Sequence, residues 1–342
     1  MSGKMLRAAV SAAVAVGLLM ASVAWAGITI KTVAVGDVGN APDLATGSLY
    51  GRVDYAYNIG KYEVTAGQYT GFLNAVGGVD TYALYNTVMS LTDSGSGITR
   101  SGGGTVGNPY TYSVAADFVN RPVNYVSWGD SARFANWLEN GQPMGAQSAS
   151  TTEDGAYYLN GATSNAQLLA VSRKAGWRWA ITSEDEWYKA AYYKGGGTNA
   201  GYWMYPTRSN SAPGQDMADV SGNNANYYTS PYAYPIDSGK YTTVVGEFEN
   251  SASAYGTFDQ GGNVWEWNDA NIDGSSRGLR GGSFSGSGLD LLLRADVRAV
   301  SNPTYEILDF GFRVSQVPEP ASIAILALGF TGMLARRRGA GR

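Results

Sequence analysis

The sequence predicts one α+β domain with few short helices, mixed short strands and long irregular connections. Helical periodicity preceded by a capping pattern occurs three times, always in the first two-thirds of the chain. The last third is rich in Gly, Asn, Tyr and Ser and shows only short strand-like runs. Between the two terminal signals described below lie about 290 residues, enough for one large hydrophobic core.

The first elements follow from alternation and capping. The β-branched run Ile28–Val33 predicts a strand, and Tyr57–Val64 predicts a second one. Thr65 then caps a helix, because Gln68 stands three residues later and completes a capping box. Residues 92–108 are dominated by Gly and Ser and predict a mobile surface loop.

Two further strand-to-helix units follow. Arg121–Val126 predicts a strand that enters a helix capped by Ser127 and Asp130. Trp177–Ile181 predicts a strand that enters a helix capped by Thr182. We expect residues 144–176 to be irregular. Long ordered loops need something that holds them, and bound calcium is one physical answer.

The N-terminus has the pattern of a secretory signal peptide over residues 1–26. A short basic start precedes an apolar stretch that ends at Ala24-Trp25-Ala26, a small-x-small cleavage pattern for signal peptidase. The alternative is a retained membrane anchor, but the apolar stretch is short for one. The globular domain is then expected over residues 27–316.

The C-terminus carries three ordered features. Val317-Pro318-Glu319-Pro320 precedes an apolar helix predicted over 321–335, and Arg336-Arg337-Arg338 closes it before a tail at 339–342. Such a helix of about 22 Å is short against roughly 30 Å of hydrocarbon, so it suits a temporary anchor. The arginines favour the cytoplasmic side, which leaves the domain outside.

This order over residues 317–338 resembles the PEP-CTERM sorting signal of Gram-negative bacteria that make an exopolysaccharide matrix. The resemblance implies an exosortase-type sorting protease as a partner. It also implies transient anchoring in the inner membrane, followed by release to the cell surface or matrix. The alternative is an ordinary C-terminal membrane tail.

Composition excludes several kinds of chemistry. The chain has no cysteine and no histidine, so it lacks a thiolate nucleophile, a Ser-His-Asp triad and the usual zinc and copper ligands. The terminal signals hold six of the 24 basic and one of the 28 acidic side chains, which leaves the domain at a formal charge of −9. An acidic domain repels nucleic acid, and its oxygen ligands select calcium or magnesium.

The most informative segment is Tyr255–Trp267. Gly261-Gly262 allows a tight turn, with Asp259 and Glu266 on either side of it. Trp265 and Trp267 alternate with Glu266 and would face away from it in a strand. This arrangement could form a calcium cage, and the alternative is a packed turn without metal.

Six motifs in order resemble the sulfatase-modifying-factor family, which includes the formylglycine-generating enzyme. The resemblance covers about residues 57–315 and implies a C-type-lectin-like fold, low in regular structure and stabilised by calcium. The matching stretches are Ile59–Thr65, Arg121–Trp128, Thr182–Trp187, Gly262–Trp267, Arg280–Phe284 and Gly311–Val314.

The resemblance also implies structural calcium ligands. In the first site they are the side chains of Asp259 and Glu266 and the carbonyls of Gly262 and Val264. A second, loosely aligned site is implied at Asn226 and Tyr227, with Asp237 as a further candidate.

The chain departs from the family where its chemistry lies. The enzyme uses a copper-binding cysteine pair after the Arg-Gly-Gly-Ser-Phe motif, and here that stretch reads Ser285–Arg294 without a thiol. A hydroxyl is not a copper(I) ligand, so no copper is expected. The related enzymes that use a histidine-bound iron have an added domain, which is also missing.

Three functions remain open. The first is a non-catalytic binding or structural protein whose partner is exopolysaccharide or a surface protein. The second is a carboxylate-based glycan-active enzyme, for which the run Glu184–Glu186 is the candidate, although acids at this position also stabilise a helix N-terminus. The third is formylglycine generation itself. Candidate sugar-stacking residues are Tyr202, Trp203, Tyr227, Tyr228, Tyr232 and Tyr234. Three arginines, Arg294, Arg298 and Arg313, could bind an anionic group or pair with core carboxylates, and we expect the pairing.

Overall fold

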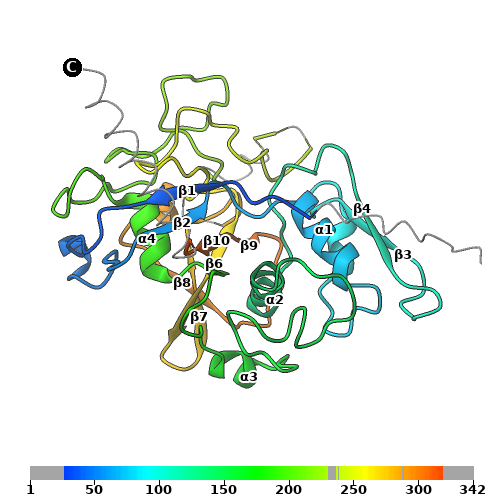
Figure 1. Ribbon diagram of the computed structural model, residues 1–342. Coiled ribbons are helices and arrows are strands. Elements are labelled where there is room, and N and C mark those ends of the chain that lie inside the picture. The colour runs from blue at the N-terminus through cyan, green and yellow to red at the C-terminus, as the bar shows by residue number, and fades with distance from the viewer. Residues whose placement is uncertain (1–26, 230–235, 238, 287–288, 319–342) are drawn as a thin grey trace, which may run out of the picture.

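The computed structural model describes residues 27–229, 236–237, 239–286 and 289–318 (Figure 1). The helices in these ranges are α1 (Ala66–Val76), α2 (Trp128–Glu139), α3 (Asn165–Ala170) and α4 (Glu184–Tyr192). Single 3-10 turns cover Leu44–Thr46, Thr87–Ser90 and Leu289–Leu293. The strands are β1 (Thr32–Val35), β2 (Tyr57–Gly60), β3 (Ile98–Ser101), β4 (Thr111–Val114), β5 (Trp179–Ile181), β6 (Trp265–Ile272), β7 (Ser276–Arg280), β8 (Ala299–Ser301), β9 (Phe310–Phe312) and β10 (Val314–Gln316).

Two small sheets organise the domain. The first has the order β1-β2-β10-β5 and is antiparallel throughout. The second has the order β8-β7-β6-β9, with β6 and β9 parallel. Only Arg313 separates β9 from β10, so the chain crosses from the second sheet to the first at this residue. A β3-β4 hairpin lies beside α1, at the right of Figure 1.

The predicted helix starts are largely confirmed. Thr65 and Gln68 form the capping box of α1, and Ser127 and Asp130 form that of α2. For α4 the predicted cap was one residue early, because Ser183 accepts from the backbone of Glu186 and completes the box instead. Each such cap is worth ~1 kcal/mol because it satisfies an amide at the helix start.

Several strand and loop predictions were wrong. The first strand begins at Thr32, and the second ends at Gly60. Arg121–Val126 is not a strand: Pro122 has no amide proton to donate, and Tyr125 adopts a φ of 56°. The stretch 92–108 contains β3, and α3 lies within the stretch expected to be irregular.

An aromatic cluster forms the main core between α1, α2 and β9. Phe134 on α2 makes edge-on contacts with Phe72 and Phe312, with ring centroids 5.3 Å apart in both cases. Trp137 packs on the same Phe72 ring. All four side chains are fully buried, so apolar burial holds the helices onto the second sheet.

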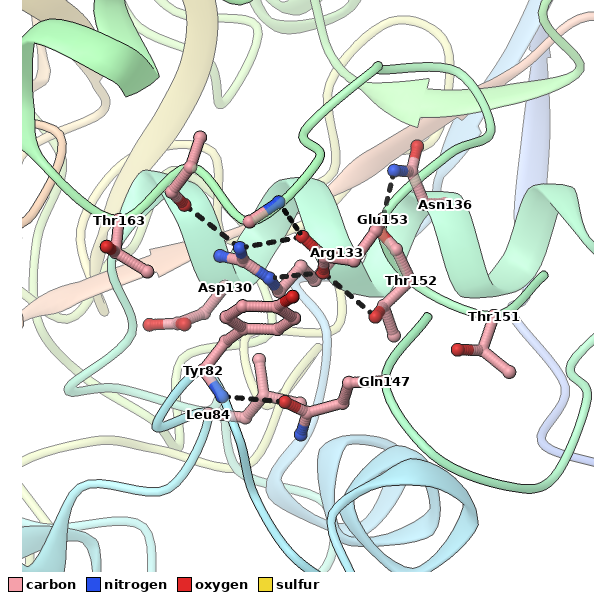
Figure 2. A network of polar contacts seen from close by, with 12 residues as sticks. Tyr82, Leu84, Asp130, Arg133, Asn136, Gln147, Thr151, Thr152, Glu153 and Thr163 are labelled. Atoms are coloured by element: carbon pink, nitrogen blue, oxygen red, sulfur yellow. Dashed lines mark hydrogen bonds and ion pairs between the residues drawn. The ribbon is translucent and has the colours of Figure 1, made fainter. Parts of the chain in front are cut away.

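Buried arginines hold the long loops. Figure 2 shows the guanidinium of Arg133 on α2, which donates to both carboxylate oxygens of Glu153 at 2.7 and 3.0 Å and to the Ala162 carbonyl. Arg277 on β7 donates to the carbonyl of Leu168 in α3 and to that of Val171 directly after this helix. A guanidinium has five donors in a rigid fork, so one side chain can tie several loop carbonyls together.

The C-terminal end of the domain runs directly into the sorting motif. The amide of Val317 donates to the Arg178 carbonyl at 2.9 Å, immediately after β10. Pro318 is the last described residue, so Glu319, Pro320, the predicted helix 321–335 and the arginine cluster lie outside the described residues, as does the predicted signal peptide. Among the residues that the structure describes, no helix is long and apolar enough to cross a membrane.

Candidate functional site

The Gly-rich turn before β6 docks onto a distant loop. Gly262 has a φ of 87°, and a Cβ there would lie 2.2 Å from the Asn226 carbonyl oxygen, so only glycine fits. The next amide, of Asn263, donates to that same carbonyl at 2.7 Å. The Asn263 side chain then accepts from the Thr243 amide at 3.0 Å. Hydrogen bonds therefore connect this turn at residue 263 to the loops that contain residues 226 and 243.

Glu266 lies at the centre of this region and is fully paired. Its two oxygens accept from Nε and Nη2 of Arg313 at 2.5 and 2.6 Å, and Trp187 Nε1 donates at 2.7 Å. Arg313 also donates to the carbonyls of Gly60 and Phe258. A guanidinium already balances this carboxylate, so Glu266 does not fit the ligand role that the family resemblance implies for calcium.

Asp259 makes fewer contacts through its carboxylate than Glu266 does. Its Oδ2 accepts from the Gly246 amide at 2.5 Å. Burial raises the pKa of Asp259 to about 6, and the nearby Glu266 carboxylate acts in the same direction. Asp259 therefore remains compatible with the predicted first calcium site, together with the carbonyls of Gly262 and Val264.

The second predicted calcium site contains a buried oxygen that lacks a partner. Asn226 Oδ1 accepts no hydrogen bond from the described residues, while its Nδ2 donates to the Tyr241 carbonyl. An orphan amide oxygen fits a calcium ligand. The Tyr227 carbonyl accepts from Gln215, and Asp237 pairs with Arg121. Within the described ranges, no three acidic side chains lie close enough together to hold a metal ion.

The motif before the stretch that would carry the family's cysteines is fixed by a buried hydrogen bond. Ser283 Oγ donates to Asp309 Oδ2 at 2.6 Å, and burial raises the pKa of Asp309. A 3-10 turn over Leu289–Leu293 follows. With no thiol in the chain, these side chains cannot perform the cysteine-dependent redox step.

The acidic run at the start of α4 is structural. Glu184 accepts from Arg280 at 2.6 Å and from Arg298 at 3.1 Å. Asp185 accepts from the Gly51 amide at 2.8 Å. Burial would raise the pKa of Glu186, but Arg173 outweighs it and the pKa is lowered. Burial raises the pKa of Asp185, but Glu184 and Glu186 are both paired with arginines, which weakens the glycan-active hypothesis.

The expected pairing with core carboxylates is confirmed for Arg298 and Arg313 but not for Arg294, whose partner is exposed. Arg298 pairs with Glu184, Arg313 with Glu266, and the partly exposed Arg294 with Asp296. None of these three guanidiniums is placed as an anion site.

The aromatic candidates are mostly part of the packing. The Tyr202 hydroxyl donates to the Ala41 carbonyl, and that of Tyr227 donates to the Pro213 carbonyl. Trp203 lies under the ammonium of Lys194, 4.6 Å from the ring centroid. Tyr228 also has a partner, while Tyr232 and Tyr234 lie outside the described residues.

A cavity that the sequence did not predict opens beside the first sheet. It has a volume of about 530 Å³, within the usual range for small-molecule sites. Its wall combines residues 28–31, the start of α1, residues 119–120 and residues 244–245, and Glu63 is among its lining residues. The motif containing Glu63 was visible in the sequence, but its burial depends on loops far away in the chain.

The comparisons with known proteins agree with this fold. The profile of the Sulfatase-modifying factor enzyme 1-like domain matches residues 51–317, and the PEP-CTERM protein-sorting motif matches residues 316–338. No curated protein matches the sequence significantly. Among solved structures, Treponema denticola variable protein 1 is similar at a TM-score of 0.51 and 19% identity, covering 86% of this chain and 97% of that one.

Two further structures are more distant. CarF is similar at a TM-score of 0.47 and 20% identity, over 85% of this chain and 99% of that one. PvdO from Pseudomonas aeruginosa has a TM-score of 0.42 and 20% identity, over 85% and 92%. At these identities the similarity concerns the fold alone.

The sorting motif marks the chain for export and for membrane-associated sorting in Gram-negative bacteria, and it implies processing by exosortase-type machinery. The profile match covers more than half of the chain and includes the motif Gly262–Trp267 described above. The chain is a cysteine-free member of the sulfatase-modifying factor enzyme 1-like family that ends in a PEP-CTERM sorting motif.

Proposed function

We propose that this protein is an exported, surface- or matrix-associated binding or structural protein that uses the family scaffold without its redox chemistry. The observation that carries the proposal is that the groups able to do chemistry are either absent or paired. The chain has no thiol, and the carboxylates that resemble acid–base candidates, Glu184 and Glu186, are tied into buried arginine pairs. A sizeable cavity remains that none of these pairs fills.

Retention on glycans tests this proposal. The purified full-length chain is passed over immobilised glycans, including the host's own exopolysaccharide, and the eluate is analysed for cleaved sugars. Retention without turnover supports a binding role. Release of shorter oligosaccharides would instead favour a glycan-active enzyme.

The family's enzymatic activity is the second candidate, and the family membership is its only support. Co-expression with a cysteine-bearing sulfatase peptide, followed by mass spectrometry, decides it. We expect the peptide cysteine to stay unmodified, since the chain cannot supply the thiol pair. Conversion of that cysteine to formylglycine would contradict the proposal.

We also propose structural calcium, supported by the orphan Oδ1 of Asn226 and by the position of Asp259. An ion at either of the two predicted sites would be held by side-chain and carbonyl oxygens and would tie loops together. Equilibrium dialysis against calcium-45 measures the retained ion directly. Asn226→Ala and Asp259→Ala are each expected to lower the retained calcium, and the exposed Asp216→Ala serves as the control. Equal retention by all variants would reject these ligands.

A further inference from the structure

Aliphatic and polar side chains both line the cavity beside the first sheet. Ile28 and Ile30 come from the segment before β1, Val119 from the loop before residue 121, and Val244 and Val245 from a distant loop. Val119 is exposed, and the other four side chains are partly buried. A second hollow, near α3, is lined mainly by small and polar residues. Of these two, the first cavity is better suited to a ligand with an apolar body.

Glu63 lines this cavity and differs from the other buried glutamates. Neither of its carboxylate oxygens has a hydrogen-bond partner among the described residues, and only 2% of the residue is exposed. The buried carboxylates of Glu153, Glu184, Glu186 and Glu266 each pair with at least one arginine. A buried carboxylate without donors is costly, so its position calls for a partner.

The surrounding cations do not supply that partner. Arg313 lies close enough to influence Glu63, but its guanidinium donates to Glu266 and to two backbone carbonyls. Lys31 belongs to the same cavity wall, but it is exposed and makes no ion pair with Glu63. No cation of the described residues therefore donates to Glu63, which leaves its carboxyl group available to a donor on a ligand.

We propose that the cavity binds a primary ammonium carried on a compact body with an apolar face, and that Glu63 receives the ammonium. An ammonium supplies one positive charge and three donors, which match the unpartnered carboxylate. The aliphatic side chains of the wall cover the methylene or ring carbon atoms of the same molecule. This inference rests on the proposed binding function and names the chemistry of its ligand.

Two sources of this chemistry are separated by matched probes. Isothermal titration of the purified full-length chain, in a buffer that keeps any structural calcium bound, compares n-hexylamine with 1-hexanol and glucosamine with N-acetylglucosamine. Within each pair the body is similar and only one member carries a primary ammonium. We expect the ammonium member of at least one pair to bind ten-fold or more tightly than its neutral partner. The pair that responds identifies an aliphatic amine or an amino sugar as the ligand class.

A near-isosteric variant tests the role of Glu63. Glu63→Gln removes the charge and keeps the shape, so it is expected to lower the ammonium affinity at least ten-fold. Glu247→Gln changes an exposed acid nearby and is expected to leave the affinity unchanged. Equal affinity for the two members of both pairs overturns the proposal without need of any variant, and so does unchanged binding by a folded Glu63→Gln protein.

The glycan-retention experiment on the same preparation keeps the two proposals apart. If glycans are retained while no ammonium probe binds, the binding function stands and the inference about Glu63 falls. If glycans are not retained but the ammonium probes bind through Glu63, the cavity is a small-molecule site and the proposed matrix partner is wrong.

Discussion

Glu266 and Glu63 belong to neighbouring regions and both are buried, but their surroundings are opposite. Glu266 receives three hydrogen bonds, two of them from one arginine, and its charge is balanced. Glu63 receives none from the described residues and lines an open cavity. An acidic residue in a family motif can therefore be paired inside the protein, or it can face a cavity without a partner. Only the contacts of its carboxylate distinguish the two cases.

The largest expected effect comes from breaking the paired region. Arg313→Met leaves Glu266 buried with its charge uncompensated, so we expect the free energy of unfolding to fall by about 3–5 kcal/mol. Urea denaturation followed by fluorescence measures this loss. The double variant Arg313→Met with Glu266→Met should recover much of it, because no charge is then buried alone. A loss below about 1 kcal/mol for the single variant would show that the pair is not the support we describe.

The opposite sign is expected at Glu63. Burial raises the pKa of Glu63 well above its ordinary value, and Asp259 adds to this, so folding favours the protonated acid. Its contribution to stability is therefore greatest at low pH and is lost as the pH rises above the ordinary value of 4.5. We expect Glu63→Gln to raise the free energy of unfolding by ~1–3 kcal/mol at pH 8. At pH 4 the difference from the native protein should be smaller. A destabilised variant at pH 8 would mean that Glu63 has a partner.

An intermediate case, Glu306, sharpens the contrast. It accepts one hydrogen bond from Asn86, and burial raises its pKa to about 8, with Asp130 acting in the same direction. Stability from this group is present at low pH and is lost between about 4.5 and 8. Thermal unfolding of Glu306→Gln across this window should show a flatter pH profile than that of the native protein. Parallel profiles would exclude Glu306 as the titrating group.

The smallest effect is expected at a surface pair. Arg294 and Asp296 lie 2.6 Å apart, but both are substantially exposed to solvent. Exposed pairs contribute at most about 1 kcal/mol, so Arg294→Met should change the free energy of unfolding by less than that. The same urea titration provides the measurement, and 1 M salt should abolish whatever difference appears. A loss as large as that of Arg313→Met would remove the distinction between buried and exposed pairs.

Local rules predicted three of the four described helices, missed α3 and predicted the strands poorly. Thr65 and Ser127 cap their helices as expected, because a cap depends on residues within one turn. The run Arg121–Val126 looked like a strand, but tertiary contacts place Tyr125 at a positive φ and leave only a single bridge at Pro122. Strand pairing depends on distant partners, so a short β-branched run is weak evidence by itself.

The candidate site also has features that the sequence predicts and features that depend on distant contacts. The sequence by itself determined the family motifs, the sorting signal and the lack of thiol and imidazole chemistry, since these depend only on which residues are present and in what order. Only the tertiary structure decided that Arg313 forms an ion pair with Glu266. It also decided that no described residue donates a hydrogen bond to Glu63. The partners of a buried charge come from segments far apart in the chain, and their distances exist only once the chain has folded.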